Sequence, residues 1–213
     1  MQLAEGSLRW AALPLVPAVL VAPLSLLASG AFVGLAVFVL FFHRDPDRQT
    51  PPEGVVAPAD GKVSVIREED DRVRLGIYMS GRDVHVNRAP MDGVVESVEH
   101  EPGSNSFAFS KDAESNERLR FEFEDYTAEQ IAGAIARRTY AYVEPGEAVE
   151  RGQRIGHISF SSRFDVLFPP AYARSDLTVE NGDRVLAGET VVASETPTSC
   201  EDSTEDVQTV GET

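Results

Sequence analysis

The stretch VEPGEAVERG, Val143 to Gly152, recurs as VENGDRVLAG, Val179 to Gly188, and both copies follow the pattern V-x-x-G-x-x-V-x-x-G. Glycine adopts positive φ without steric cost, so each unit predicts turns at its glycines and valines that point into a core. Another pair of copies, APADGKV from Ala57 and APMDGVV from Ala89, lies earlier in the chain. Repeated turn-and-strand units of this kind predict a flattened antiparallel barrel or sandwich that is mainly β.

Short apolar or alternating runs bounded by turn residues support the same fold. The expected strands cover 54–57, 62–66, 73–79, 93–98, 119–123, 139–143, 154–160 and 190–193. Thr127 to Arg138 is predicted to be a helix, because Thr127 and Gln130 have capping-box spacing and arginines close the run. The pattern resembles biotinyl and lipoyl carrier domains, so a non-catalytic, membrane-anchored carrier or assembly module is one alternative. Against it, Lys62 lacks the flanking residues expected of a carrier lysine at a hairpin tip.

The N-terminal region is predicted to associate with a membrane. Trp10 to Phe42 contains no charged residue and is longer than the roughly 20 apolar residues that cross a bilayer as a helix. Three prolines and Ser29-Gly30 interrupt it, which allows either one span or two short helices folded as a hairpin. Arg44 and Arg48 follow directly and favour a cytoplasmic exit. A cleaved signal peptide is the alternative, but the run is too long for one.

Composition narrows the partners and the compartment. The formal net charge is −16 and Lys62 and Lys111 are the only lysines, so nucleic acid is excluded as an expected partner. An acidic, lysine-poor surface resembles that of proteins from a high-salt cytoplasm. The single Cys200 gives neither a disulfide framework nor a thiol metal cluster. We expect a membrane-associated segment over 1–48, a folded domain over 49–193 on the cytoplasmic side of the cell membrane, and a disordered acidic tail over 194–213.

Two polar stretches interrupt the β pattern: MSGRDVHVNRAPMDGVV, Met79 to Val95, and GHISFSSRFDVLFPP, Gly156 to Pro170. In the first, His85 alternates with Val84 and Val86, and an exposed polar strand face would explain it without any chemistry, although the surrounding motif argues against that explanation. The second contains two adjacent serines, Ser161 and Ser162. Each feature alone has a purely structural explanation, as has Asp60, which precedes a glycine and would cap a turn.

Four motifs in order, VVAPADGKV, DVHVNRAPMDGVV, NER at Asn116 to Arg118 and GHISFSSRFDVLFP, resemble the short-form phosphatidylserine decarboxylases over roughly Phe41 to Val192. These enzymes of phospholipid synthesis depend on a pyruvoyl group. The resemblance implies decarboxylation of a phosphoserine lipid, phosphatidylserine or archaetidylserine, to the phosphoethanolamine lipid and CO2. A lipid substrate also accounts for the apolar N-terminus.

The resemblance also assigns the site residues. The pyruvoyl group would derive from Ser162 when autocatalytic serinolysis breaks the bond between Ser161 and Ser162, leaving a β chain of residues 1–161 and an α chain of 162–213. Its carbonyl would serve as the electron sink for decarboxylation. No metal is expected. His85 is the expected general acid that returns a proton to the substrate, and Asp60 the carboxylate that assists self-processing.

Two departures from the family pattern concern this site. The family commonly has glycine where this chain has Ser161, and glycine accepts strained backbone conformations that serine resists, so slower processing is expected. Long-form members carry a second histidine where this chain has Arg88. Arg88, Arg163 and Arg118 are the candidates for binding the lipid phosphate. The sequence leaves the oligomeric state open, and a homo-oligomer is allowed.

Overall fold

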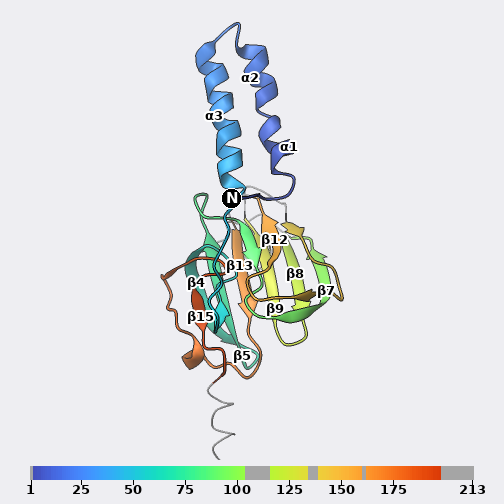
Figure 1. Ribbon diagram of the computed structural model, residues 1–213, viewed down its shortest axis with the longest axis vertical. Coiled ribbons are helices and arrows are strands. Elements are labelled where there is room, and N and C mark those ends of the chain that lie inside the picture. The colour runs from blue at the N-terminus through green and yellow to red at the C-terminus, as the bar shows by residue number, and fades with distance from the viewer. Residues whose placement is uncertain (1, 104–115, 134–138, 160–161, 198–213) are drawn as a thin grey trace, which may run out of the picture.

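A computed structural model describes residues 2–103, 116–133, 139–159 and 162–197. A helical hairpin at the N-terminus stands on a β domain (Figure 1). The hairpin consists of α1 (Ser7–Ala12), α2 (Leu15–Val21) and α3 (Leu26–Phe42), and the last helix packs against the first two. The single-span alternative is therefore replaced by the hairpin.

The β domain is built from one large sheet and smaller ones. Its eight-stranded antiparallel sheet has the order β11-β7-β8-β9-β13-β5-β4-β14, and three small sheets pair β10-β12-β6, β15-β3 and β1-β2. The strands are β1 (Gln2–Leu3), β2 (Arg44–Asp45), β3 (Val55–Val56), β4 (Gly61–Glu69), β5 (Arg72–Met79), β6 (Val86–Arg88), β7 (Gly93–Glu101), β8 (Arg118–Phe123), β9 (Thr127–Ala132), β10 (Thr139–Ala141), β11 (Ala148–Val149), β12 (Arg154–Ile158), β13 (Ser162–Leu167), β14 (Arg184–Val185) and β15 (Val191–Ala193). A short 3₁₀ helix, η2, covers Arg174–Asp176. The large sheet curls as a half-barrel, and the core lies between it and the small sheets.

The internal repeats have the structure that their sequences predict. All four repeat glycines have positive φ, between 73° and 104°, and all four repeat valines are buried. Each V-x-x-G unit pairs with one A-P-x-D-G unit: Val149 lies opposite Gly93, and Val185 opposite Gly61. The prediction of a mainly antiparallel β domain is confirmed, and each of the eight expected strand segments contains a strand.

The helix predicted over Thr127 to Arg138 is wrong where the structure describes it. Thr127–Ala132 forms β9, a strand inside the large sheet between β8 and β13, while 134–138 lie outside the described residues. All six residues of β9 are buried, including Glu129 and Gln130. Strand partners on both sides satisfy the backbone, and this long-range pairing overrides a weak local helix preference.

The hairpin exposes apolar side chains along its length. Several of its leucines and valines are more than 60% exposed, and Leu24 and Leu27 near its tip reach 87%. Pro23 lies in the turn between α2 and α3, whereas Ser29-Gly30, expected to interrupt the run, lies within α3. Among the described residues, no helix combines the length and the apolar content needed to cross a bilayer.

Candidate active site

Ser162 is the first residue of β13, at the centre of the large sheet. It is fully buried and paired with Met79 of β5 on one side and Ala132 of β9 on the other. Its Oγ lies 3.9 Å from the sulfur of Met79, which also accepts a contact at 3.6 Å from Nδ2 of Asn87. Phe160 and Ser161 lie outside the described residues, so only one side of the predicted cleavage point has a position.

His85 lies directly before β6 and is buried, which rules out the purely structural alternative of an exposed strand face. Its Nδ1–H donates to the carbonyl of Asp83 at 3.0 Å, and Nε2 is buried with no hydrogen-bond partner among the described residues. Burial lowers the pKa of His85 to about 4. The ring is therefore neutral near pH 7, and Nε2 offers a lone pair that can take a proton.

Two further histidines lie beside it, from segments far apart in the chain. His43 follows α3 and donates from Nδ1 to the carbonyl of Val39 at 2.8 Å, while its Nε2 lies 3.2 Å from Oγ of Ser159. His157 on β12 stacks on Tyr140 with 4.2 Å between ring centroids, and its ring lies 6.1 Å from that of His43. Burial lowers the pKa of both, that of His157 to about 3.

The cluster of His43, His85 and His157 adjoins the strand that leads to Ser162. The carbonyl of His85 accepts the N–H of Ile158 at 3.1 Å, and Ser159 follows. Sequence reasoning missed His43, which lies outside the four motifs, and His157, which lies within the last of them but was assigned no role. The only signals were their positions: His43 ends the uncharged run, and His157 precedes the serines. In the described part of the chain, no group of three or more histidine, cysteine, aspartate or glutamate side chains has the geometry of a metal site.

Asp60 lies apart from the other two predicted site residues. Its carboxylate receives two hydrogen bonds from Arg48, at 2.9 and 2.7 Å, and one from the Ala187 N–H at 2.8 Å. Burial raises its pKa, although these donors and the N–H of Val84 favour the ionised form. Among the described residues, no hydrogen bond joins any two of Ser162, His85 and Asp60. Asp60 reaches His85 only through the backbone of the neighbouring residue.

The second repeat explains one function of this aspartate. Asp92, the equivalent of Asp60, accepts the N–H of Arg151 at 2.6 Å just as Asp60 accepts that of Ala187. The cap that Asp60 was predicted to give its own turn stays a prediction; what both repeats share is an aspartate that accepts the N–H of the residue before a glycine in the paired V-x-x-G unit. What distinguishes Asp60 is its burial and its ion pair with Arg48. Its part in self-processing stays a prediction.

The candidate phosphate ligands are engaged inside the protein. Arg163 forms two hydrogen bonds with Asp165, at 2.7 and 2.9 Å, and is buried. Arg118 reaches Glu129 at 3.9 Å. Arg88 is also buried; it donates to the carbonyls of Gly152 and Pro46 and pairs with Asp45 at 3.3 Å. Binding a phosphate would require each arginine to give up these partners.

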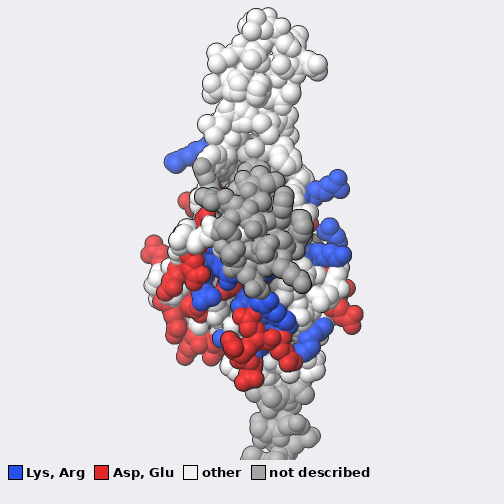
Figure 2. All heavy atoms as spheres, turned by 180° about the vertical axis from the view of Figure 1, so that it is seen from behind, with Lys and Arg blue, Asp and Glu red and all other residues white. Residues whose placement is uncertain are grey.

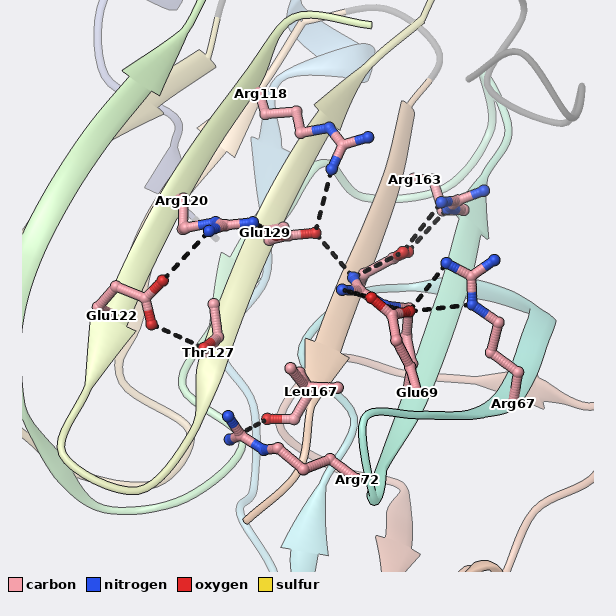
Figure 3. Close-up of polar contacts among 12 residues, drawn as sticks. Arg67, Glu69, Arg72, Arg118, Arg120, Glu122, Thr127, Glu129, Arg163 and Leu167 are labelled. Carbon is pink, nitrogen blue, oxygen red and sulfur yellow. Dashed lines mark hydrogen bonds and ion pairs between the residues drawn. The ribbon is translucent and has the colours of Figure 1, made fainter. Parts of the chain in front are cut away.

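Figure 3 shows the network to which two of these arginines belong. It crosses one face of the large sheet and joins β4, β5, β13, β9 and β8. Glu129, almost fully buried, receives hydrogen bonds from Arg74 at 2.7 Å and Arg120 at 2.6 Å, and Arg74 also reaches Asp165 at 3.4 Å. Buried charges require such partners, because an unpaired one is costly. The network therefore holds β13 between its neighbours behind Ser162.

Lys62 does not fit the carrier alternative. It lies within β4, opposite Tyr78 on β5 and Arg184 on β14, and not at the tip of a hairpin. A carrier lysine must swing its attached group between sites, and a position inside a sheet does not provide that reach. The structure gives no support to a carrier.

The sequences of known proteins identify the chain. A sequence model described as phosphatidylserine decarboxylase matches residues 35–193. A Halobacterium salinarum protein named "Putative archaetidylserine decarboxylase proenzyme" is 56% identical over 90% of this chain and 99% of its own. A phosphatidylserine decarboxylase proenzyme of Streptomyces avermitilis is 43% identical over 89% of this chain and 92% of its own. The chain belongs to the phosphatidylserine decarboxylase family and is a decarboxylase.

Proposed function

We propose that this enzyme decarboxylates a phosphoserine lipid at a membrane surface, using a pyruvoyl group made from its own Ser162. The observation that carries the proposal is the burial of Ser162 at the start of β13, where its Oγ lies against the sulfur of Met79. The same sulfur contacts Asn87, two residues after His85. The proenzyme names of the relatives agree with a chain that is cleaved during maturation.

Self-cleavage can be written with residues of this chain alone. Oγ of Ser162 attacks the carbonyl carbon of Ser161 while a base takes the hydroxyl proton, and the amide becomes an ester. Loss of the α proton of residue 162 then expels the carboxylate of Ser161. The resulting enamine hydrolyses to the pyruvoyl group and ammonia. We assign the base to His85, whose Nε2 carries a lone pair with no partner among the residues that the structure describes.

The residues near Ser162 fit a small carbonyl group at this position. The surroundings are buried and mostly apolar, which suits an uncharged carbonyl group. The buried Oε1 of Gln130 and Nε2 of His85 have no partner among the described residues; both are acceptors, so they suit a donor such as the hydroxyl of the precursor or the amine of the headgroup. When present, the pyruvoyl group supplies the electron sink that stabilises negative charge as CO2 leaves. Exclusion of water by Met79 and the histidine rings protects that charge from premature protonation.

His85 is also the proposed proton donor to the substrate carbon. With a pKa of about 4 the free enzyme holds little of the protonated form near neutral pH. An anionic phosphoserine headgroup next to the ring would raise that pKa and favour the charged form. His85 could then serve as base in self-cleavage and as acid in decarboxylation.

The hairpin is the proposed membrane anchor. It carries no charged residue from Trp10 to Phe42, and Figure 2 shows an uncharged projection above a domain with charged side chains of both signs. Basic side chains lie on both sides of the domain close to the hairpin, where they would face anionic headgroups. An inserted hairpin would hold His43, which follows α3 directly, towards the bilayer that holds the lipid. The domain is proposed to lie on the cytoplasmic side.

The lipid backbone is proposed to be the archaeal ether type, which makes the substrate archaetidylserine. The acidic, lysine-poor composition suits a high-salt cytoplasm. The Halobacterium salinarum relative is named for this substrate, as is a Methanosarcina mazei protein that is 44% identical over 77% of this chain.

Intact mass of the protein produced in a high-salt host tests the proposal. The wild-type chain should appear as two fragments that meet between residues 161 and 162, the smaller one lighter than its encoded mass by the loss of ammonia. Ser162→Ala should remain one chain and release no CO2 from serine lipids, while Ser97→Ala, a control serine on β7, should be cleaved like the wild type. A single wild-type chain, or a cleaved Ser162→Ala chain, would refute the mechanism.

A further inference from the structure

Both ends of the N-terminal hairpin contact the histidine cluster. The C-terminal end of α3 supplies His43 itself, and Phe42 lies with its ring 4.2 Å from that of His85. At the other end, the N–H of Glu5 donates to the hydroxyl of Tyr142 at 3.1 Å. That hydroxyl lies 2.7 Å from Nδ1 of His157. His85 therefore contacts the hairpin base directly through Phe42. His157 is connected to it through the hydroxyl of Tyr142, which accepts the N–H of Glu5.

Short strands fix the hairpin base on the β domain. Gln2–Leu3 pairs with Arg44–Asp45, and the N–H of Ala4 donates to the carbonyl of His43 at 2.8 Å. Asp45 continues into the domain by pairing with Arg154 and Arg88. A shift of the hairpin would therefore move the histidine environment, because ordered backbone and buried side chains connect the two.

Phe42 is only 1% exposed, although most large side chains of α3 face outward. Its ring covers His85 and also lies 5.3 Å from the ring of His43. A buried phenylalanine in this position keeps water from the imidazole. His43 in turn contacts Ser159, with 3.2 Å between Nε2 and the serine Oγ. Ser159 lies two residues before Ser161, the residue whose carbonyl is attacked in the proposed cleavage.

We propose that the hairpin base is part of the catalytic site, with His43 as a positioning residue for the segment that is cleaved and Phe42 as the cover that keeps His85 neutral. This inference rests on the proposed function, because it assigns roles around Ser162. The hairpin then acts as more than an anchor: seating it on the domain assembles the site. Self-cleavage would proceed only in a chain whose hairpin is in place.

The test follows self-cleavage over time in full-length chains made by cell-free synthesis into lipid nanodiscs, with intact mass as the readout. His43→Ala should slow cleavage about tenfold, the effect of losing one positioning hydrogen bond. Ser159→Ala should slow cleavage to the same extent, and the double variant should be no slower, because each change removes the same hydrogen bond between His43 and Ser159. His43→Gln, which keeps an acceptor for the serine hydroxyl, should recover most of the rate.

The pH dependence of cleavage tests whether Phe42 shields His85 from water or only stabilises the fold. Asp83, Arg44, His43 and His157 are the charged or titratable groups that act on His85. Phe42→Ala leaves all of them in place but admits water, so the acidic limb of the rate profile should move upward by about one pH unit. Leu35→Ala, a truncation at an exposed position of α3, should leave the profile unchanged. A merely structural role would lower the melting temperature without moving this limb.

Two outcomes distinguish failure of this inference from failure of the proposed function. The inference alone is overturned if the wild-type chain cleaves, His43→Ala cleaves at the same rate, and the pH profile of Phe42→Ala overlays that of the wild type. A wild-type chain that stays intact overturns both. If His43→Ala does not fold, Ser159→Ala and the comparison of Phe42→Ala with Leu35→Ala give the same decision.

Discussion

Acid should destabilise this protein well before its carboxylates titrate, because His85 and His157 are buried in the neutral form. Their pKa values in the folded chain are about 4 and about 3, against an ordinary value of 6.5. In the unfolded chain both titrate near 6.5, so below that pH the unfolded state binds more protons. The free energy of unfolding must then fall as the pH falls.

The magnitude follows from the two shifts. Each histidine that is protonated only on unfolding lowers the free energy of unfolding by about 1.4 kcal/mol per pH unit below 6.5. Between pH 8 and pH 5 this is about 2 kcal/mol for each of His85 and His157, or about 4 kcal/mol together. His43, whose pKa is also lowered, adds to the same direction.

Urea unfolding of the full chain in detergent micelles, at pH 8 and pH 5, measures this loss. The Ser162→Ala background keeps the protein as one chain. His157→Phe is the informative variant, because a phenyl ring can keep the stacking on Tyr140 but cannot be protonated, and it should reduce the pH-dependent loss by about 2 kcal/mol. A parent that loses less than about 1 kcal/mol, or a variant that loses as much as the parent, would refute the reasoning.

Three further predictions concern other parts of the molecule. In the same background, Asp60→Ala should lower the free energy of unfolding by about 1–3 kcal/mol, because it removes one of the two carboxylates that pair with buried Arg48, Glu189 being the other, and leaves the N–H of Ala187 without its acceptor; urea unfolding at pH 8 checks this, and a loss below about 0.5 kcal/mol would contradict it. Gly61→Ala should prevent or strongly impair folding, because a Cβ there would lie 2.2 Å from the carbonyl oxygen of Tyr78; an unchanged melting curve would contradict it. Leu27→Glu, at a position 87% exposed near the hairpin tip, should reduce co-sedimentation with vesicles and leave self-cleavage unchanged; equal sedimentation would argue against the hairpin as anchor.

The parts of the fold that could be predicted from the sequence are those set by local geometry. The repeat glycines need positive φ wherever they occur, and the repeat valines must point inward once those turns form. Thr127–Ala132 shows the opposite case. Its helix signals are local, but Glu129 is held by Arg74 and Arg120 from neighbouring strands, and no local pattern reports those partners.

The site divides in the same way. Ser162, His85 and Asp60 could be named from ordered motifs, whereas His43 and His157 gain their importance from contacts between distant segments. Asp60 could not be assigned to one role, because its turn hydrogen bond and its ion pair with Arg48 serve the fold whether or not it takes part in chemistry.

The central position of β13 has a consequence for assembly. Cleavage before Ser162 would place β13, β14 and β15 in the smaller chain, and each pairs with strands of the larger one: β13 with β5 and β9, β14 with β4, and β15 with β3. A larger chain without β13 would be left with a gap inside its sheet and two unpaired edges. The precursor can refold as a single molecule, but the mature enzyme, once its chains separate, must find its missing strand by a bimolecular reaction whose yield depends on concentration. After maturation, separated chains would therefore no longer refold by the unimolecular reaction that is available to the precursor.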